Sequence, residues 1–135
     1  MLWASQVAPG HENGLRLRVY GTKGGIEWVQ AEPNTLLHSP LGAPRQSVTR
    51  GSTAAGPAAA RVTRIPPGHP EGYLEGFANL YTDVATAIRA VDAGQPIPGQ
   101  VDFPGIADGV IGMAFIEAAV KSSAAGALWV RPDFV

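Results

Sequence analysis

The sequence predicts an α+β fold, with a largely antiparallel open β-sheet and two main helices packed on one face. Two early runs, residues 15–20 and 25–30, alternate apolar and polar side chains on either side of a glycine-rich turn. Two later segments, beginning near Pro70 and near Phe103, repeat apolar side chains at helical spacing. Strands that precede helices in this way are typical of α+β proteins.

The first hairpin is the best-defined element of the prediction. A four-residue turn between residues 15–20 and 25–30 gives three cross-strand pairs: Val19 with Ile26, Arg18 with Glu27, and Leu17 with Trp28. This register joins apolar to apolar and positive to negative side chains, which stabilises an antiparallel pair. The other face is mixed and is expected to be solvated or to meet another subunit; it holds Arg16, Arg18, Tyr20, Glu27 and Val29.

Weaker signals suggest the remaining extended segments. Short strands are expected at residues 2–7, 35–38, 46–49 and 61–65, and a closing strand or extended tail at 128–130. The low-complexity stretch 51–60 is expected to form a mobile loop, because it is rich in Gly, Ser, Ala and Pro.

Two helices are expected in the second half of the chain. The first begins near Pro70 and carries an apolar stripe of Phe77, Tyr81, Val84, Ile88 and Val91. A turn at residues 92–98 separates it from the second, which begins at Phe103-Pro104 and ends near Ser123. Small residues in the second helix permit close packing on a neighbouring sheet, so we interpret it as a core helix.

Composition limits the class of protein. The 135 residues fit a single domain, 1–135, which can bury roughly two-thirds of its unfolded surface. A net charge of −1 gives no reason to expect nucleic acid or an anionic membrane as a partner. No apolar run approaches the roughly 20 residues that span a bilayer, and the sequence does not begin with a signal-peptide pattern. The chain has no cysteine, which excludes disulfides and thiolate metal sites. A cytoplasmic location is therefore expected.

The segment Gly68–Tyr73 is the main candidate for chemistry. It places polar groups between a Pro/Gly-rich loop and a strongly periodic helix. Pro70 suits the first turn of a helix and Glu71 suits its positive end. Because a helix start commonly binds an anion or a polar ligand, we select His69, Glu71 and Tyr73 as candidate ligand contacts.

Each candidate also has a structural interpretation. His69 is a helix-entry residue with a local hydrogen bond, a substrate contact or a metal ligand. No third ligand lies at a recognisable spacing from His69 and Glu71, so no metal site is predicted. Tyr73 either donates its hydroxyl to a ligand or is a half-buried aromatic residue whose hydroxyl meets water. Glu75, one turn after Glu71, is interpreted as a solvated side chain.

Two blocks of the chain resemble a known enzyme family. They are SQVAPGHENGLRLRVYGTKGGIEW, from Ser5, and GHPEGYLEGFANLYTDVATAI, from Gly68. In this order they are similar to the second domain of the glucose-fructose oxidoreductase, inositol dehydrogenase and MocA (Gfo/Idh/MocA) family, and the resemblance extends to about Trp129. It implies the substrate-binding and oligomerisation domain of an NAD(P)-dependent oxidoreductase that acts on a sugar, polyol or related hydroxy compound. It further implies a homo-oligomer, a dimer or tetramer, formed through the sheet face.

Much of that family's catalytic machinery has no counterpart in this sequence. Family members carry an N-terminal nucleotide-binding domain, a Glu-Lys-Pro segment with a catalytic lysine, and an Asp/His pair early in the second domain. Here the turn Gly21–Gly25 joins two strands, whereas a dinucleotide-binding turn must open a helix. The chain's two lysines, Lys23 and Lys121, lie in that turn and near a helix end.

These absences set what is expected of the chain alone. The N-terminal nucleotide-binding domain is absent, and the chain alone has no catalytic residue, binds no cofactor and is not catalytically competent. NAD(P) belongs to an intact family member. The alternative is a stand-alone, non-catalytic binding or assembly module.

Overall fold

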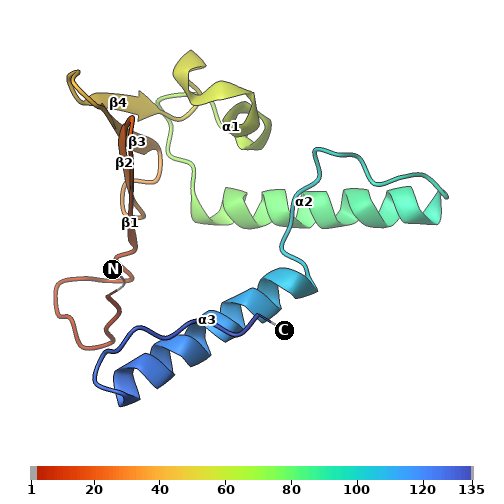
Figure 1. Ribbon diagram of the computed structural model, residues 1–135. Coiled ribbons are helices and arrows are strands. Elements are labelled where there is room, and N and C mark those ends of the chain that lie inside the picture. Colours follow the sequence, from red (N-terminus) through yellow and green to blue (C-terminus); the bar gives the residue numbers. More distant parts are fainter. Residues whose placement is uncertain (1–2, 135) are drawn as a thin grey trace. The chain divides into compact units, whose positions relative to one another are not determined.

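A computed structural model describes residues 3–134 of the chain (Figure 1). The chain divides into two compact units, Met1–Asn79 and Leu80–Val135. The first unit contains a four-stranded antiparallel sheet, a short helix and the first turns of a long helix, and the second contains two long helical segments. The predicted α+β class with an open antiparallel sheet is confirmed.

The sheet has its strands in chain order. They are β1 (Arg16–Gly21), β2 (Gly24–Val29), β3 (Thr35–Pro40) and β4 (Gln46–Thr49), so β1 and β4 form the two edges (Figure 1). All four correspond to predicted strands: alternation of side chains identified β1 and β2, and weaker signals identified β3 and β4. The further strand predicted at 2–7 is absent from the described residues 3–7, and Leu2 lies outside the described residues.

The predicted register of the first hairpin is confirmed. Val19 lies opposite Ile26, and the two neighbouring pairs follow in step. The connection is tighter than predicted, because Gly21 still pairs with Gly24. Gly24 has φ of +150°, and a Cβ atom there would lie 2.4 Å from the carbonyl oxygen of Ser39. Only glycine allows β3 to approach this closely.

The segment predicted as a mobile loop is helical instead. A 3-10 turn, η1 (Thr53–Ala55), leads into the helix α1 (Gly56–Val62). Pro57 occupies the first turn of α1 and three alanines follow, and both features favour a helix. The strand predicted at 61–65 was also wrong, because Arg61 and Val62 complete α1. The loop was predicted from composition, which did not take account of the high helix propensity of alanine.

The two long helices are confirmed, with shifted boundaries. They are α2 (Tyr73–Asp92) and α3 (Ile106–Ala124). In the second unit the connection between them is fastened to α2, since the backbone N–H of Asp102 donates to the buried Asp83 carboxylate at 3.2 Å. No strand forms at 128–130.

The apolar stripe predicted on α2 does not form a core. Tyr81, Ile88 and Val91 are each more than half exposed. Among the described residues, the buried apolar side chains are those of three alanines: Ala87, Ala114 and Ala118. The spacing therefore identified the helix correctly, but it did not show what covers the stripe.

Candidate functional site

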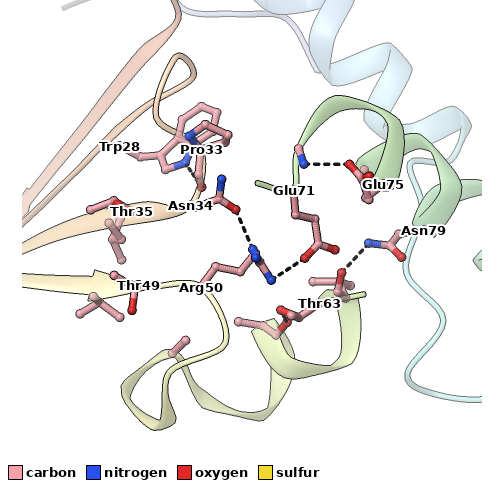
Figure 2. Close-up of a pocket in the computed structure, with 17 residues that line it drawn as sticks. Trp28, Pro33, Asn34, Thr35, Thr49, Arg50, Thr63, Glu71, Glu75 and Asn79 are labelled. Atoms are coloured by element: carbon pink, nitrogen blue, oxygen red, sulfur yellow. Dashed lines mark hydrogen bonds and ion pairs between the residues drawn. The ribbon is translucent and has the colours of Figure 1, made fainter. Parts of the chain in front are cut away.

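The candidate site is built around an ion pair in the first unit. Arg50, directly after β4, approaches Glu71 with 2.6 Å between Nη1 and Oε2 (Figure 2). The side chains are only 15% and 5% exposed. The Glu71 carboxylate also accepts the backbone N–H groups of Arg64 (2.7 Å) and Ile65 (3.2 Å). Both carboxylate oxygens are thus hydrogen-bonded, as a buried charge requires.

The remaining donors of Arg50 extend this contact along the turn 65–71. Nη1 donates to the carbonyl of Ile65 at 2.6 Å, and Nη2 donates to those of Pro66 and His69 at 3.3 and 2.7 Å. On the other side, Nε donates to Oδ1 of Asn34 at 2.6 Å (Figure 2). A guanidinium group presents five donors in a rigid plane, so one side chain can hold several parts of a turn.

Close packing accompanies these hydrogen bonds. Gly51 has φ of +75°, and a Cβ atom there would lie 2.7 Å from Cγ of Pro67. Gly72 likewise lies against Pro33, whose carbonyl accepts the indole N–H of Trp28 at 3.1 Å. The turn therefore rests on the loops at the ends of β2 and β4.

The start of α2 differs from the prediction. The helix begins at Tyr73, and Glu71 does not lie in its first turn, because its carboxylate is turned toward Arg50. Glu75 takes that place instead: its carboxylate accepts the backbone N–H of Gly72 at 2.9 Å. This hydrogen bond is the largest cause that lowers the pKa of Glu75, followed by the Glu75 backbone N–H. The charges of Arg50 and Arg64 lower the pKa further, and desolvation opposes them.

Asn79 joins the end of α1 to α2. Its amide nitrogen donates to the carbonyl of Val62 at 2.8 Å, and its amide oxygen accepts from Nε of Arg64 at 2.5 Å. Arg64 also donates to the carbonyl of Ala78 at 3.1 Å. The segment between the two helices is therefore held at both ends.

An open cavity of about 340 Å³ lies beside this network (Figure 2). Its polar side chains come from the strand ends and from α2, and its apolar ones come mainly from the sheet and α1. The lining residues include Trp28, Thr35, Thr49, Glu71, Glu75 and Asn79. An indole face beside hydroxyl, amide and carboxylate groups suits a compact hydroxylated molecule.

The three residues selected from the sequence occupy different environments. Glu71 is buried and lines the cavity. The side chain of His69 is exposed, and its carbonyl is bound by Arg50. Tyr73 is 77% exposed, and its ring centroid lies 4.9 Å from that of Phe77. The structure thus brings His69 and Glu71 together around Arg50, and it leaves the side chains of His69 and Tyr73 on the surface.

Arg50 and Asn34 were missed by the sequence analysis. A buried glutamate requires a cation, but the chain has ten Lys and Arg residues and the sequence does not show which one pairs. The only local signal is the Arg50-Gly51 pair at the end of a strand, since glycine there permits a close approach of another segment.

Within residues 3–134 no group of three or more His, Cys, Asp or Glu side chains is placed to hold a metal ion. In the same residues no helix is long and apolar enough to cross a membrane. The turn Gly21–Gly25 joins β1 to β2, as predicted, so it lacks the helix N-terminus that a dinucleotide phosphate requires.

Comparison with known proteins identifies the family. Residues 1–131 match the model of the C-terminal α/β domain of the Gfo/Idh/MocA oxidoreductase family. The chain is 33% identical over 131 residues to the uncharacterized oxidoreductase YfiI of Bacillus subtilis (strain 168), covering 96% of this chain and 33% of that protein.

Solved structures give a similar result. An oxidoreductase from Sinorhizobium meliloti is 55% identical with a TM-score of 0.87, over 94% of this chain and 35% of that one. An inositol dehydrogenase homolog from Azotobacter vinelandii, in complex with NADH and myo-inositol, is 36% identical with a TM-score of 0.87, over 95% and 34%. The chain thus spans about a third of the length of these relatives. It belongs to the Gfo/Idh/MocA family of oxidoreductases, of which it forms the C-terminal α/β domain.

Proposed function

We propose that the chain is the substrate-binding and oligomerisation domain of an NAD(P)-dependent oxidoreductase that acts on a sugar, polyol or related hydroxy compound. The observation that carries this proposal is the Arg50-bound turn 65–71, in which Glu71 lines a cavity together with hydroxyl and amide groups and His69 remains exposed on the same turn. A relative with 36% identity has been solved with NADH and myo-inositol, which supports a polyol as the substrate class.

The three candidate residues take different parts in this proposal. The His69 imidazole and the Tyr73 hydroxyl can each donate and accept a hydrogen bond, as recognition of a polyol hydroxyl requires. Glu71 lines the cavity, but its carboxylate oxygens already accept hydrogen bonds from the protein. We therefore assign the direct contacts mainly to His69 and Tyr73, and a charged, supporting contact to Glu71.

Hydride transfer would need parts that these residues do not supply. Bound NAD(P) would accept or donate the hydride, and in our proposal a further part of a family-length protein holds that cofactor. The geometry of Gly21–Gly25 does not fit a dinucleotide phosphate, so we assign no cofactor contact to this chain. We accordingly propose that the chain alone is inactive. The cytoplasmic location stays a prediction from the sequence.

Oligomerisation through the sheet is the second part of the proposal. The edge strand β1 leaves Tyr20 75% exposed and Val19 61% exposed. Exposed apolar side chains on an edge strand favour contact with another polypeptide. Light scattering should therefore show a dimer or tetramer, and a strict monomer at high concentration would contradict this part. Tyr20→Lys should weaken association, whereas Tyr81→Lys, at a similarly exposed position on α2, should leave it unchanged.

Ligand binding is tested by titrating the ¹⁵N-labelled chain with myo-inositol and following its amide NMR signals. We expect saturable changes confined to residues 65–75. His69→Ala and Tyr73→Phe should each weaken binding about tenfold, because each removes a hydrogen bond to the ligand. His11→Ala and Tyr81→Phe are the matched controls, since both side chains are exposed and lie outside residues 65–75 and outside β1. Equal losses in the controls, or changes spread over the sheet, would contradict the assignment.

A stand-alone binding or assembly module is the second candidate function, favoured by the exposed side chains of β1. The mass of the native polypeptide separates the two. A mass near 14.0 kDa supports the module, and a mass about three times larger supports a domain of an oxidoreductase. Titration with NADH, followed by tryptophan fluorescence, should show no tight binding to the chain in either case.

A further inference from the structure

We infer that Arg50 is the positioning residue of the candidate site: it fixes the turn 65–71, which leads into α2, and so determines where His69 stands. The inference rests on the proposed function for its consequence, since it is the polyol that His69 and Tyr73 would meet. That Arg50 holds the turn does not depend on the proposed function, because its contacts with the turn support this directly.

The contacts of Arg50 cover the turn from one end to the other. Its Nη atoms bind the carbonyls of Ile65, Pro66 and His69, and Nη1 also pairs with the Glu71 carboxylate. Without these contacts the turn keeps one internal backbone–backbone hydrogen bond among those described, from the N–H of His69 to the carbonyl of Pro66 at 3.3 Å, and the bonds from the N–H groups of Arg64 and Ile65 to the Glu71 carboxylate. The Glu71 bonds depend on a buried carboxylate, which needs the charge of Arg50 opposite it.

Arg50 is itself held in place, which a positioning residue requires. Its Nε donates to the side-chain oxygen of Asn34 at 2.6 Å, and the backbone N–H of Arg50 donates to the backbone carbonyl of Asn34 at 2.8 Å. Only 15% of its side chain is exposed. The guanidinium plane therefore has a fixed orientation before any ligand arrives.

Burial of Glu71 makes the arrangement specific to arginine. Lysine would supply one positive charge opposite the carboxylate, but it has no planar fork to reach three carbonyls at once. Arg50→Lys should therefore keep the ion pair and lose most of the grip on the turn. Arg50→Met removes both.

The experiment compares the unmodified chain with Arg50→Met, Arg50→Lys and the control Arg45→Met. Arg45 lies at the opposite end of β4, and its 54% exposed side chain pairs with Glu27 on the surface. Two quantities are measured: the hydrogen-exchange rates of the Ile65 and His69 amides, with the β2 and β3 amides as a monitor of the fold, and the dissociation constant for myo-inositol.

Arg50→Met should raise the exchange rates of the two turn amides about tenfold or more, and weaken myo-inositol binding about tenfold, with the β2 and β3 amides still protected. Arg50→Lys should give an intermediate result, and Arg45→Met should match the unmodified chain. If Arg50→Met also raises exchange at the β2 and β3 amides, the sheet itself is unfolding in that variant. Exchange at Ile65 and His69 in Arg50→Lys then tests the inference, since Arg50→Lys retains the charge opposite Glu71.

The two proposals fail in different ways. Unchanged exchange at Ile65 and His69 in both Arg50 variants would overturn the inference. A loosened turn with an unchanged dissociation constant would overturn the positioning role and leave the proposed function standing. If the unmodified chain does not bind myo-inositol, the proposed function fails, and the exchange rates alone then support or overturn the hold of Arg50 on the turn.

Discussion

Two glutamates of the first unit meet arginines that flank the same strand, and their surroundings differ. Glu71 meets Arg50, after β4, in side chains that are 5% and 15% exposed. Glu27 meets Arg45, before β4, at 3.2 Å and Arg16, on β1, at 3.4 Å, and both arginine side chains are more than half exposed. Both join a carboxylate to a guanidinium group, and their first difference is burial. A buried pair can fix the shape of a segment, whereas an exposed pair only adds charge to a surface.

The difference extends to hydrogen bonding. Glu71 accepts two backbone N–H groups in addition to Arg50, and Arg50 binds three backbone carbonyls. The described contacts of Glu27 are with side chains alone. Main-chain partners cannot move away without changing the path of the backbone, so the Glu71 cluster couples charge to conformation and the Glu27 cluster does not.

Removing the buried carboxylate charge should have the largest effect. Glu71→Gln leaves Arg50 buried without a counter-ion, and breaking a buried pair in this way costs about 3–5 kcal/mol. We expect a loss of that size in the free energy of unfolding of the first unit, measured by urea denaturation with hydrogen exchange of the β2 and β3 amides. A loss below about 1 kcal/mol would mean that the buried Glu71 pair contributes no more than an exposed pair such as that of Glu27, which would contradict the difference proposed between them.

Asn34→Ala tests the support of Arg50 with a smaller change. The variant removes the acceptor for Nε and keeps the Glu71 pair. A hydrogen bond to a charged group contributes about 1.5–3 kcal/mol, so we expect a loss in that range by the same measurement. Gln30→Ala is the control, because its amide makes an exposed hydrogen bond to the carbonyl of Asn13. Equal losses of unfolding free energy in Asn34→Ala and Gln30→Ala would show that the hydrogen bond from Arg50 contributes no more than an exposed one.

The pH dependence of stability extends the comparison to Glu75, on which the charges of Arg50 and Arg64 act. Its pKa is lowered in the folded chain, chiefly by the Gly72 N–H. A lowered pKa stabilises the fold above the unfolded value, and this stabilisation is lost as the pH falls through the folded value. Glu75→Gln should therefore flatten the decline in stability just below the ordinary pKa of a glutamate. Identical pH profiles for the two chains, from urea denaturation, would contradict this assignment.

How much of this site the sequence could predict depends on the range of the interactions. Alternation gave the β1–β2 register, because each pair depends on side chains a few residues apart. Helical spacing gave α2 and α3 for the same reason. The Arg50–Glu71 pair joins residues far apart in the sequence, and no local pattern specifies which of the chain's cations faces a given carboxylate. The displaced start of α2 follows from that contact, so it was missed as well.

The smallest effect is expected at the exposed cluster. Glu27→Gln removes a carboxylate that has two arginine partners, but each arginine keeps its hydration, and exposed pairs contribute about 0.2–1 kcal/mol. Ions in solution screen exposed charges over a Debye length of roughly 8 Å at physiological ionic strength, and added salt shortens this length, so the loss should shrink further when salt is added. Glu71→Gln should change little with salt, because its partner is shielded from ions by the protein. Urea denaturation of both variants at low and high salt measures the contrast. A loss of stability at Glu27 that equals the loss at Glu71 and does not depend on salt would contradict this prediction. Exposure would then not govern the strength of these pairs. The role assigned to the buried pair would have to rest on its main-chain contacts alone.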